Sequence, residues 1–375
     1  MTIIMLIFVT SLFFAGVGTP LIRKMATESG FIAVPKADRA HTEPTALMGG
    51  LAIYAAAIVA LLLITILVTQ LVANPFKLSE FASIILGASL MAAVGLWDDR
   101  RPMPPWAKLG LQFAAVPLVF WVGVRVHLPL GVSFWNSAIN FVITAVWILF
   151  ITNAINFLDN ADGIAIMTSA TTSAIFMLIA VLNGQLLVSA LAAAVLGASL
   201  GFARYSLPLP KTTIFMGDAG ALFLGYLLAI LGIKIRIPLN DIQITWMVPI
   251  IVLGLPIFDT ILVFISRKRR GVSFLQGGVD HTNHRLGRLG MDGLSVALAI
   301  GLINGALGLI AIFITQASLM EAYTVAGALV LLAFYELWQL EFKASYQFRT
   351  GTTPPQSSEL SAETKEGDLP PDSLV

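Results

Sequence analysis

Short clusters of Asp, Asn and Gly residues interrupt an otherwise apolar sequence. Carboxylate and amide oxygens suit Mg²⁺, which proteins usually bind through one or two carboxylates together with substrate phosphates. Arg, Lys and His residues stand in or beside the same clusters, and such groups neutralise phosphate oxygens. The combination predicts Mg²⁺-dependent phosphoryl or glycosyl-phosphoryl transfer, a chemistry that needs positioning and charge neutralisation more than covalent catalysis.

The first cluster is GLWDDRR at residues 95–101, and Lys108 follows it. Asp98 and Asp99 end a hydrophobic stretch, where the partial negative charge of a helix C-terminus disfavours carboxylates unless a cation offsets them. The two arginines that follow could be simple ion-pair partners. The alternative is a magnesium–phosphate site.

The second cluster is NAINFLDNADG at residues 153–163. At helical spacing its amides and its carboxylates form two offset stripes, made by Asn153, Asn156 and Asn160 and by Asp159 and Asp162. Lys, Glu and Ser are missing, so a solvated loop explains the cluster poorly. Capping explains one or two of these residues, and a binding site explains the set.

The remaining clusters are FMGDAG at residues 215–220 and GGVDHTNHRL at residues 277–286. Asp218 could be an N-cap of the next helix, although its flanking glycines would also admit a phosphate at a helix N-terminus. His281, His284 and Arg285 suit phosphate recognition better than a zinc site. Asp259, inside an apolar run, needs either a function or a buried partner.

The composition indicates that a membrane-embedded body positions these clusters. Of the 375 residues, 57% are hydrophobic and 11% charged, and mean hydropathy is +0.88. The net charge of +1 excludes a polybasic nucleic-acid binder, and the absence of cysteine excludes disulfides and thiolate chemistry. Neither a Walker loop nor a strand-associated G-x-G-x-x-G motif is present.

Apolar runs predict an all-α polytopic membrane protein with about eleven transmembrane helices, since roughly 20 apolar residues cross a bilayer. The expected spans are 2–21, 47–73, 81–97, 107–126, 136–156, 163–182, 186–205, 219–235, 243–265, 293–315 and 321–340. Residues 1–340 would form a transmembrane catalytic domain. Residues 341–375, which are rich in Pro, Ser, Thr and acids, would form a disordered cytoplasmic tail.

The basic residues predict the orientation. With the N-terminus outside and the C-terminus cytoplasmic, eighteen of the 22 Lys and Arg residues face the cytoplasm. Only Lys77, Arg125, Lys234 and Arg236 then lie outside. The polar clusters share the cytoplasmic side, which suits one lipidic and one water-soluble substrate. We therefore expect a multi-pass protein of the cell inner (plasma) membrane with a cytoplasmic active site.

The motifs in this order resemble the polyprenyl-phosphate N-acetylhexosamine-1-phosphate transferase family (glycosyltransferase family 4). They are Gly95…Asp98-Asp99, Asn153-x-x-Asn156-x-x-Asp159-x-x-Asp162-Gly163, Met216-Gly217-Asp218-x-Gly220 and His281-x-x-His284-Arg285-Leu286. The resemblance covers about residues 1–340. It is closer to the UDP-GlcNAc:undecaprenyl-phosphate GlcNAc-1-phosphate branch than to the phospho-MurNAc-pentapeptide translocase.

The resemblance implies that a lipid phosphate attacks the sugar-proximal phosphorus of a UDP-sugar, releasing UMP and initiating a cell-envelope polysaccharide such as lipopolysaccharide or teichoic acid. It implies Mg²⁺, with Mn²⁺ as an acceptable substitute, and is compatible with a homodimer. Asp98, Asp99 and Asp218 would be catalytic, and Asp218 and Asn156 would hold the metal. Substrate binding would fall to Lys108, Asn153, Asn156, Asp159, Asp162, His281, His284 and Arg285.

One departure concerns the histidine motif, which in the family commonly reads His-x-His-His and here has Asn283 in third place. Three alternatives remain open on sequence grounds. They are a phospho-MurNAc-pentapeptide transferase, a CDP-alcohol phosphotransferase and a cation-coupled transporter. The last would place paired charges at mid-membrane, where only Asp259 qualifies.

Overall fold

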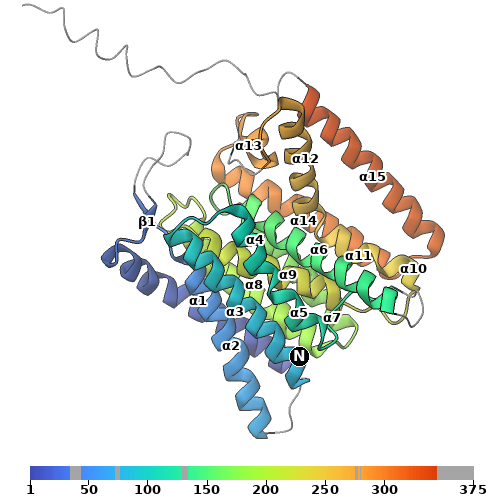
Figure 1. Ribbon diagram of the computed structural model, residues 1–375, viewed down its shortest axis with the longest axis horizontal. Helices are drawn as coiled ribbons and strands as arrows, with labels where there is room; N and C mark the ends of the chain where they lie inside the picture. The colour runs from blue at the N-terminus through green and yellow to red at the C-terminus, as the bar shows by residue number, and fades with distance from the viewer. Residues whose placement is uncertain (34–43, 72–76, 129–133, 275–277, 279, 344–375) are drawn as a thin grey trace, which may run out of the picture.

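The computed structural model describes residues 1–33, 44–71, 77–128, 134–274, 278 and 280–343. This part of the chain is almost entirely helical (Figure 1). The helices are α1 (Thr2–Glu28), α2 (Gly49–Leu71), α3 (Leu78–Arg100), α4 (Pro105–Phe113), α5 (Ala115–Phe120), α6 (Phe134–Leu158), α7 (Ile164–Leu182), α8 (Leu186–Ser206), α9 (Gly217–Lys234), α10 (Ile242–Thr245), α11 (Met247–Val252), α12 (Gly254–Arg270), α13 (Thr282–Gly287), α14 (Gly293–Ile314) and α15 (Leu319–Phe342).

Within the described residues, nine helices are long and apolar enough to cross a membrane, and a bent helix pair would make a tenth. The predicted class, an all-α polytopic membrane protein, is confirmed. The predicted count of about eleven is slightly too high. Which side of the membrane the N-terminus faces stays a prediction.

The span expected at 107–126 is two short helices, α4 and α5, and this accounts for the difference in count. Pro117 explains the break, because it has no N–H to donate to the carbonyl of Phe113, where α4 ends. The span expected at 243–265 is also interrupted. Its two parts, Ile242–Val252 and Gly254–Arg270, meet at 68°, and Pro256 likewise cannot donate to Val252.

The core of the bundle is α9, whose residues from Ala219 to Ile233 are all buried. It packs against α3, α6 and α2, while α1 and α7 cover α8 (Figure 1). At the edge, α15 is mostly exposed, as a lipid-facing apolar helix is expected to be. It extends through Phe342, two residues past the predicted domain boundary. The predicted disordered tail spans residues 341–375, and all of it after residue 343 lies outside the described residues.

A short antiparallel pair, β1 (Ile32–Ala33) and β2 (Thr45–Ala46), brings the start of α2 beside the start of α9. Ala46 accepts a hydrogen bond from the N–H of Phe215 at 2.9 Å. Gly50 donates to the carbonyl of Met216 at 2.7 Å. A Cβ atom at Gly50 would lie only 2.0 Å from the backbone N of Gly220, so only glycine permits this approach. The N-terminus of α9, with Asp218, is thereby fixed in the body.

Candidate active site

Lys108 joins three helices at one end of the bundle. Its Nζ lies 2.9 Å from Oδ2 of Asp98, at the end of α3, and also contacts Asp218, in the first turn of α9. It donates to Oδ1 of Asn156 on α6 at 3.4 Å. Asn156 in turn donates to Oδ1 of Asp218 at 2.8 Å. The structure thus brings together four of the residues that the sequence singled out.

Asp99 has a different environment from its neighbour. Its two carboxylate oxygens accept the backbone N–H groups of Asp218 at 2.8 Å and Ala219 at 3.1 Å, so it caps α9 from another helix. Gly95 lets the two helices meet, because a Cβ there would lie 2.3 Å from the carbonyl oxygen of Asp218. Gly217 provides the left-handed turn with φ +68°. Asp99 therefore positions Asp218.

Asp98, in contrast, keeps one side of its carboxylate at the cavity. Oδ1 accepts the backbone N–H of Met103 at 2.6 Å, which orients the group, and Oδ2 faces Lys108. Farther along α6, Asn153 donates to Gln112 at 2.7 Å and to the carbonyl of Leu149 at 2.8 Å. Asn153 is held by neighbours and still lines the cavity.

The loop after α6 carries the other two predicted acids. Burial raises the pKa of Asp159 well above its usual range, and neighbouring carboxylates, Asp218 first among them, add to the shift. Oδ2 of Asp162 accepts a hydrogen bond from Oγ of Thr212 at 2.7 Å. Asn160 accepts from Asn283 at 2.7 Å, which ties this loop to α13.

The histidine motif divides into different environments. His281 Nδ1 lies 2.7 Å from Asp259 on α12. Burial lowers the pKa of His284 to about 4, with His281 adding to the effect, so His284 is neutral at neutral pH. It can meet a substrate as a hydrogen-bonding group, but it brings no positive charge.

Arg285 is buried, and its predicted contact with substrate stays a prediction. Its guanidinium donates to the carbonyl oxygens of Asp280 and Leu340. It also donates to Ser266 at 3.1 Å and to the carboxylate of Glu341 at 2.9 Å. These contacts hold α13 against α12 and the end of α15.

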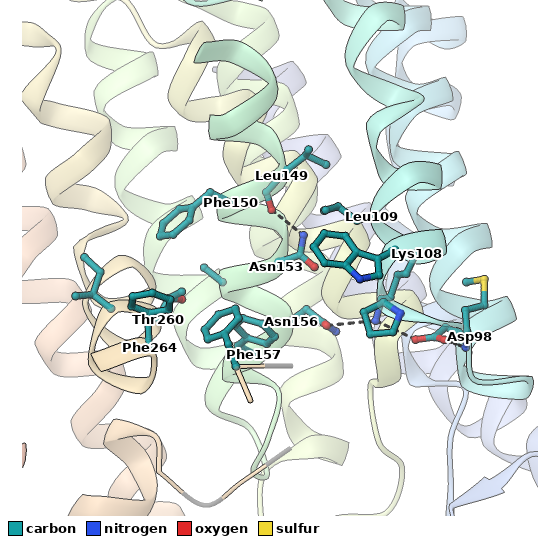
Figure 2. Close-up of a pocket in the computed structure, with 16 residues that line it drawn as sticks. Asp98, Lys108, Leu109, Leu149, Phe150, Asn153, Asn156, Phe157, Thr260 and Phe264 are labelled. Carbon is teal, nitrogen blue, oxygen red and sulfur yellow. Dashed lines mark hydrogen bonds and ion pairs between the residues drawn. The ribbon is translucent and has the colours of Figure 1, made fainter. Parts of the chain in front are cut away.

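A cavity of about 630 Å³ opens beside Asp98, Lys108 and Asn156, which together with Asp218 form the Lys108 cluster. Figure 2 shows its two different walls. Asp98, Lys108 and Asn156 form the polar end, whereas Phe150, Phe157 and Phe264 give an apolar surface that reaches α12. Such a cavity can take a molecule with a charged group at one end and a hydrocarbon chain at the other.

The oxygen atoms of Asp218 and Asn156 are the candidate ligands for Mg²⁺. Among the described residues, no group of three His, Cys, Asp or Glu side chains is arranged as a closed metal site. Mg²⁺ does not require one, because it keeps waters and commonly uses one or two carboxylates plus substrate phosphates. Asp218 and the amide oxygen of Asn156 are partly exposed, both contact Lys108, and suit that mode.

Sequence reasoning missed two supporting residues. Thr212 donates to Asp162 in the 159–163 loop, and Glu341 accepts from Arg285. The sequence carried a signal for Asp259, because a carboxylate within an apolar run requires a partner. No local signal pointed to Thr212 or Glu341, since their partners are 50 and 56 residues away.

Comparison with known proteins finds a family match and similar transferases. Residues 81–236 match the family model described as Glycosyl transferase family 4. A probable undecaprenyl-phosphate N-acetylglucosaminyl 1-phosphate transferase of Bacillus subtilis (strain 168) is 28% identical, over 88% of this chain and 89% of the relative. A decaprenyl-phosphate N-acetylglucosaminephosphotransferase of Mycobacterium tuberculosis (strain ATCC 25618 / H37Rv) is 27% identical, over 83% and 84%.

A second kind of relative matches over a shorter region. A phospho-N-acetylmuramoyl-pentapeptide-transferase of Levilactobacillus brevis is 28% identical, over 54% of this chain and 64% of the relative. The family match contains Asp98, Lys108, Asn156 and Asp218, the four residues of the polar cluster. The family match and the relatives confirm the resemblance drawn from the motifs.

Proposed function

We propose that this protein transfers GlcNAc-1-phosphate from UDP-GlcNAc to undecaprenyl phosphate, releasing UMP and beginning the assembly of a cell-envelope polysaccharide. The observation that carries the proposal is the cavity with the Lys108 cluster at one end and aromatic side chains along the other. The relatives that match more than four fifths of the chain are named as polyprenyl-phosphate GlcNAc phosphotransferases. The pentapeptide branch matches little more than half of it.

In this proposal the lipid phosphate lies at Lys108, and its isoprenoid chain lies along Phe150, Phe157 and Phe264. An oxygen of the lipid phosphate attacks the sugar-proximal phosphorus of the UDP-sugar. The bond from that phosphorus to the bridging oxygen breaks, and UMP leaves with the oxygen. Lys108 neutralises phosphate charge, and preorganised charges of this kind are a major source of catalysis.

Asp98 orients the attacking phosphate or takes its remaining proton. A phosphate monoester has a second pKa near about 6, so much of the acceptor is already ionised at neutral pH. Asp218 and Asn156 would hold Mg²⁺, or Mn²⁺ in its place, and the ion would neutralise the donor's pyrophosphate. Asn153, Asp159, Asp162, His281 and His284 would line the side that takes the nucleotide sugar.

We place the site at the cytoplasmic face of the plasma membrane. The support is the excess of Lys and Arg on the segments that share a side with the polar clusters. UDP-sugars are water-soluble and the acceptor is a lipid, so a site at the bilayer surface gives both access.

The test is UMP release by purified protein with Mg²⁺ and undecaprenyl phosphate, offering UDP-GlcNAc and UDP-MurNAc-pentapeptide in parallel. We expect release from UDP-GlcNAc alone, abolished by EDTA and by Asp218→Asn. Release from the pentapeptide donor alone would keep the reaction and overturn the choice of sugar. Uptake of UDP-sugar into proteoliposomes without UMP release would favour the transporter alternative.

A further inference from the structure

Asp259 has a carboxylate that is fully buried in the helix bundle, with 0% side-chain exposure. Its two oxygens face the start of α13. Oδ2 lies 2.7 Å from Nδ1 of His281, and Oδ1 accepts the backbone N–H of Thr282 at 2.7 Å. One side chain thus both caps α13 and contacts the first histidine of the motif.

The contact determines which ring nitrogen of His281 carries a proton. An ionised carboxylate can only accept hydrogen bonds, so beside an ionised Asp259 the Nδ1 atom is the donor. Among the described residues Nε2 then has no hydrogen-bond partner. Buried carboxylates fix histidine tautomers in this way in hydrolytic triads and around metal-bound histidines.

His281 is connected to the candidate site through its own helix and through α12. Asn283, two residues on, donates to Asn160 in the loop that carries Asp159 and Asp162. Thr260, next to Asp259, lines the cavity that holds Lys108. The orientation of His281 is therefore tied to the elements that surround this cavity.

We propose that Asp259 is a positioning residue of this transferase. Its carboxylate keeps the proton of His281 on Nδ1 and so leaves Nε2 for a polar group of the nucleotide-sugar donor. Asp259 itself does not touch the substrate. This inference rests on the function proposed above for the assignment of the donor, but the proton position can be measured without it.

The substitution Asp259→Asn separates the contact with His281 from the cap on α13. The amide oxygen of Asn can still accept the N–H of Thr282, so the cap on α13 is retained. The amide nitrogen then faces Nδ1 of His281 as a donor, and the ring must move its proton to Nε2. Asp292→Asn is a matched control, because Asp292 caps α14 by accepting the N–H of Ser295 at 2.7 Å and is exposed.

The first measurement is NMR of full-length protein labelled with ¹⁵N-histidine, with His281→Gln used to assign the resonance. We expect Nδ1 to carry a proton in the wild type, whether the ring is neutral or cationic. Nδ1 should lose that proton in Asp259→Asn and keep it in Asp292→Asn. A neutral wild-type ring with its proton on Nε2, or a spectrum unchanged by Asp259→Asn, would overturn the proposal. If the variant does not fold, a neutral wild-type ring with its proton on Nε2 would still overturn the proposal.

The second measurement is a double-mutant cycle on UMP release. Removing a group that orients a metal-binding histidine typically costs about 10- to 100-fold in metal affinity or activity, and we expect a similar range for His281. We expect a loss of that size for Asp259→Asn, less than about 3-fold for the same change in a His281→Gln background, and none for Asp292→Asn. If the fold-losses of the two single variants multiply in the double variant, Asp259 acts independently of His281. A wild-type protein without UMP release would refute the proposed function instead, and the NMR result would still stand.

Discussion

The ammonium of Lys108 lies 2.9 Å from the carboxylate of Asp98 and bridges it to Asp218. Without this cation two carboxylates would face each other, and like charges at such a distance repel strongly in a partly dry site. Lys108→Met should reduce UMP release by at least about 100-fold, the range typical for loss of one preorganised charge. Lys24→Met, which changes an exposed lysine on α1, is the control and should release UMP at the wild-type rate.

Asp98→Asn tests the other end of that contact. The amide keeps the hydrogen bond from Met103 but can neither carry charge nor take a proton. We expect turnover to fall by about 100- to 10,000-fold, the range for a general acid–base group. Rates should be measured from pH 6 to pH 9. Near-normal turnover across that range would exclude a role as base or as nucleophile.

Asp99 should respond differently from Asp98 because its oxygens accept backbone N–H groups of α9. Asp99→Asn keeps one acceptor, and Asp99→Ala keeps none. We expect Asp99→Ala to cost about 0.5–2 kcal/mol of stability, as the loss of a helix cap does. Asp99→Asn should retain more UMP release than Asp98→Asn. Equal inactivity of the two Asn variants would assign Asp99 to the chemistry instead.

The lowered pKa of His284 predicts that the stability of the protein depends on pH. Burial lowers its pKa to about 4, below the unfolded value of 6.5, so the unfolded chain binds more protons between these two values. The contribution of neutral His284 to the free energy of unfolding is complete above pH 6.5. It is lost as pH falls toward 4, by at most about 1.4 kcal/mol per pH unit. His284→Gln should show a shallower loss of thermal stability from pH 7 to pH 4.5. Parallel melting curves for both proteins would contradict this.

Most of the fold followed from hydropathy, because a bilayer requires long apolar helices whatever their partners are. The exceptions were the broken helices at Phe113 and Val252. Each lies four residues before a proline, so the signal was present although a count of apolar residues does not use it.

The grouping of Asp98, Lys108, Asn156 and Asp218 was predictable because unusual polar residues at one side of a membrane protein have few other uses. What each group does locally was not predictable. Asp98 lines the cavity, whereas the adjacent Asp99 caps α9. Arg285 of the histidine motif forms an ion pair with Glu341. These outcomes depend on tertiary contacts between residues far apart in the chain.

The close approach of Gly50 to Gly220 has a consequence for how the protein tolerates variation. Neither residue has a functional side chain, yet the contact between them fixes the position of Asp218. In a saturation mutagenesis screen these two positions should be as intolerant as the carboxylates themselves, and even alanine should fail. Intolerance to substitution in this protein will therefore mark backbone contact as well as chemistry, and only the purified variants will tell the two apart.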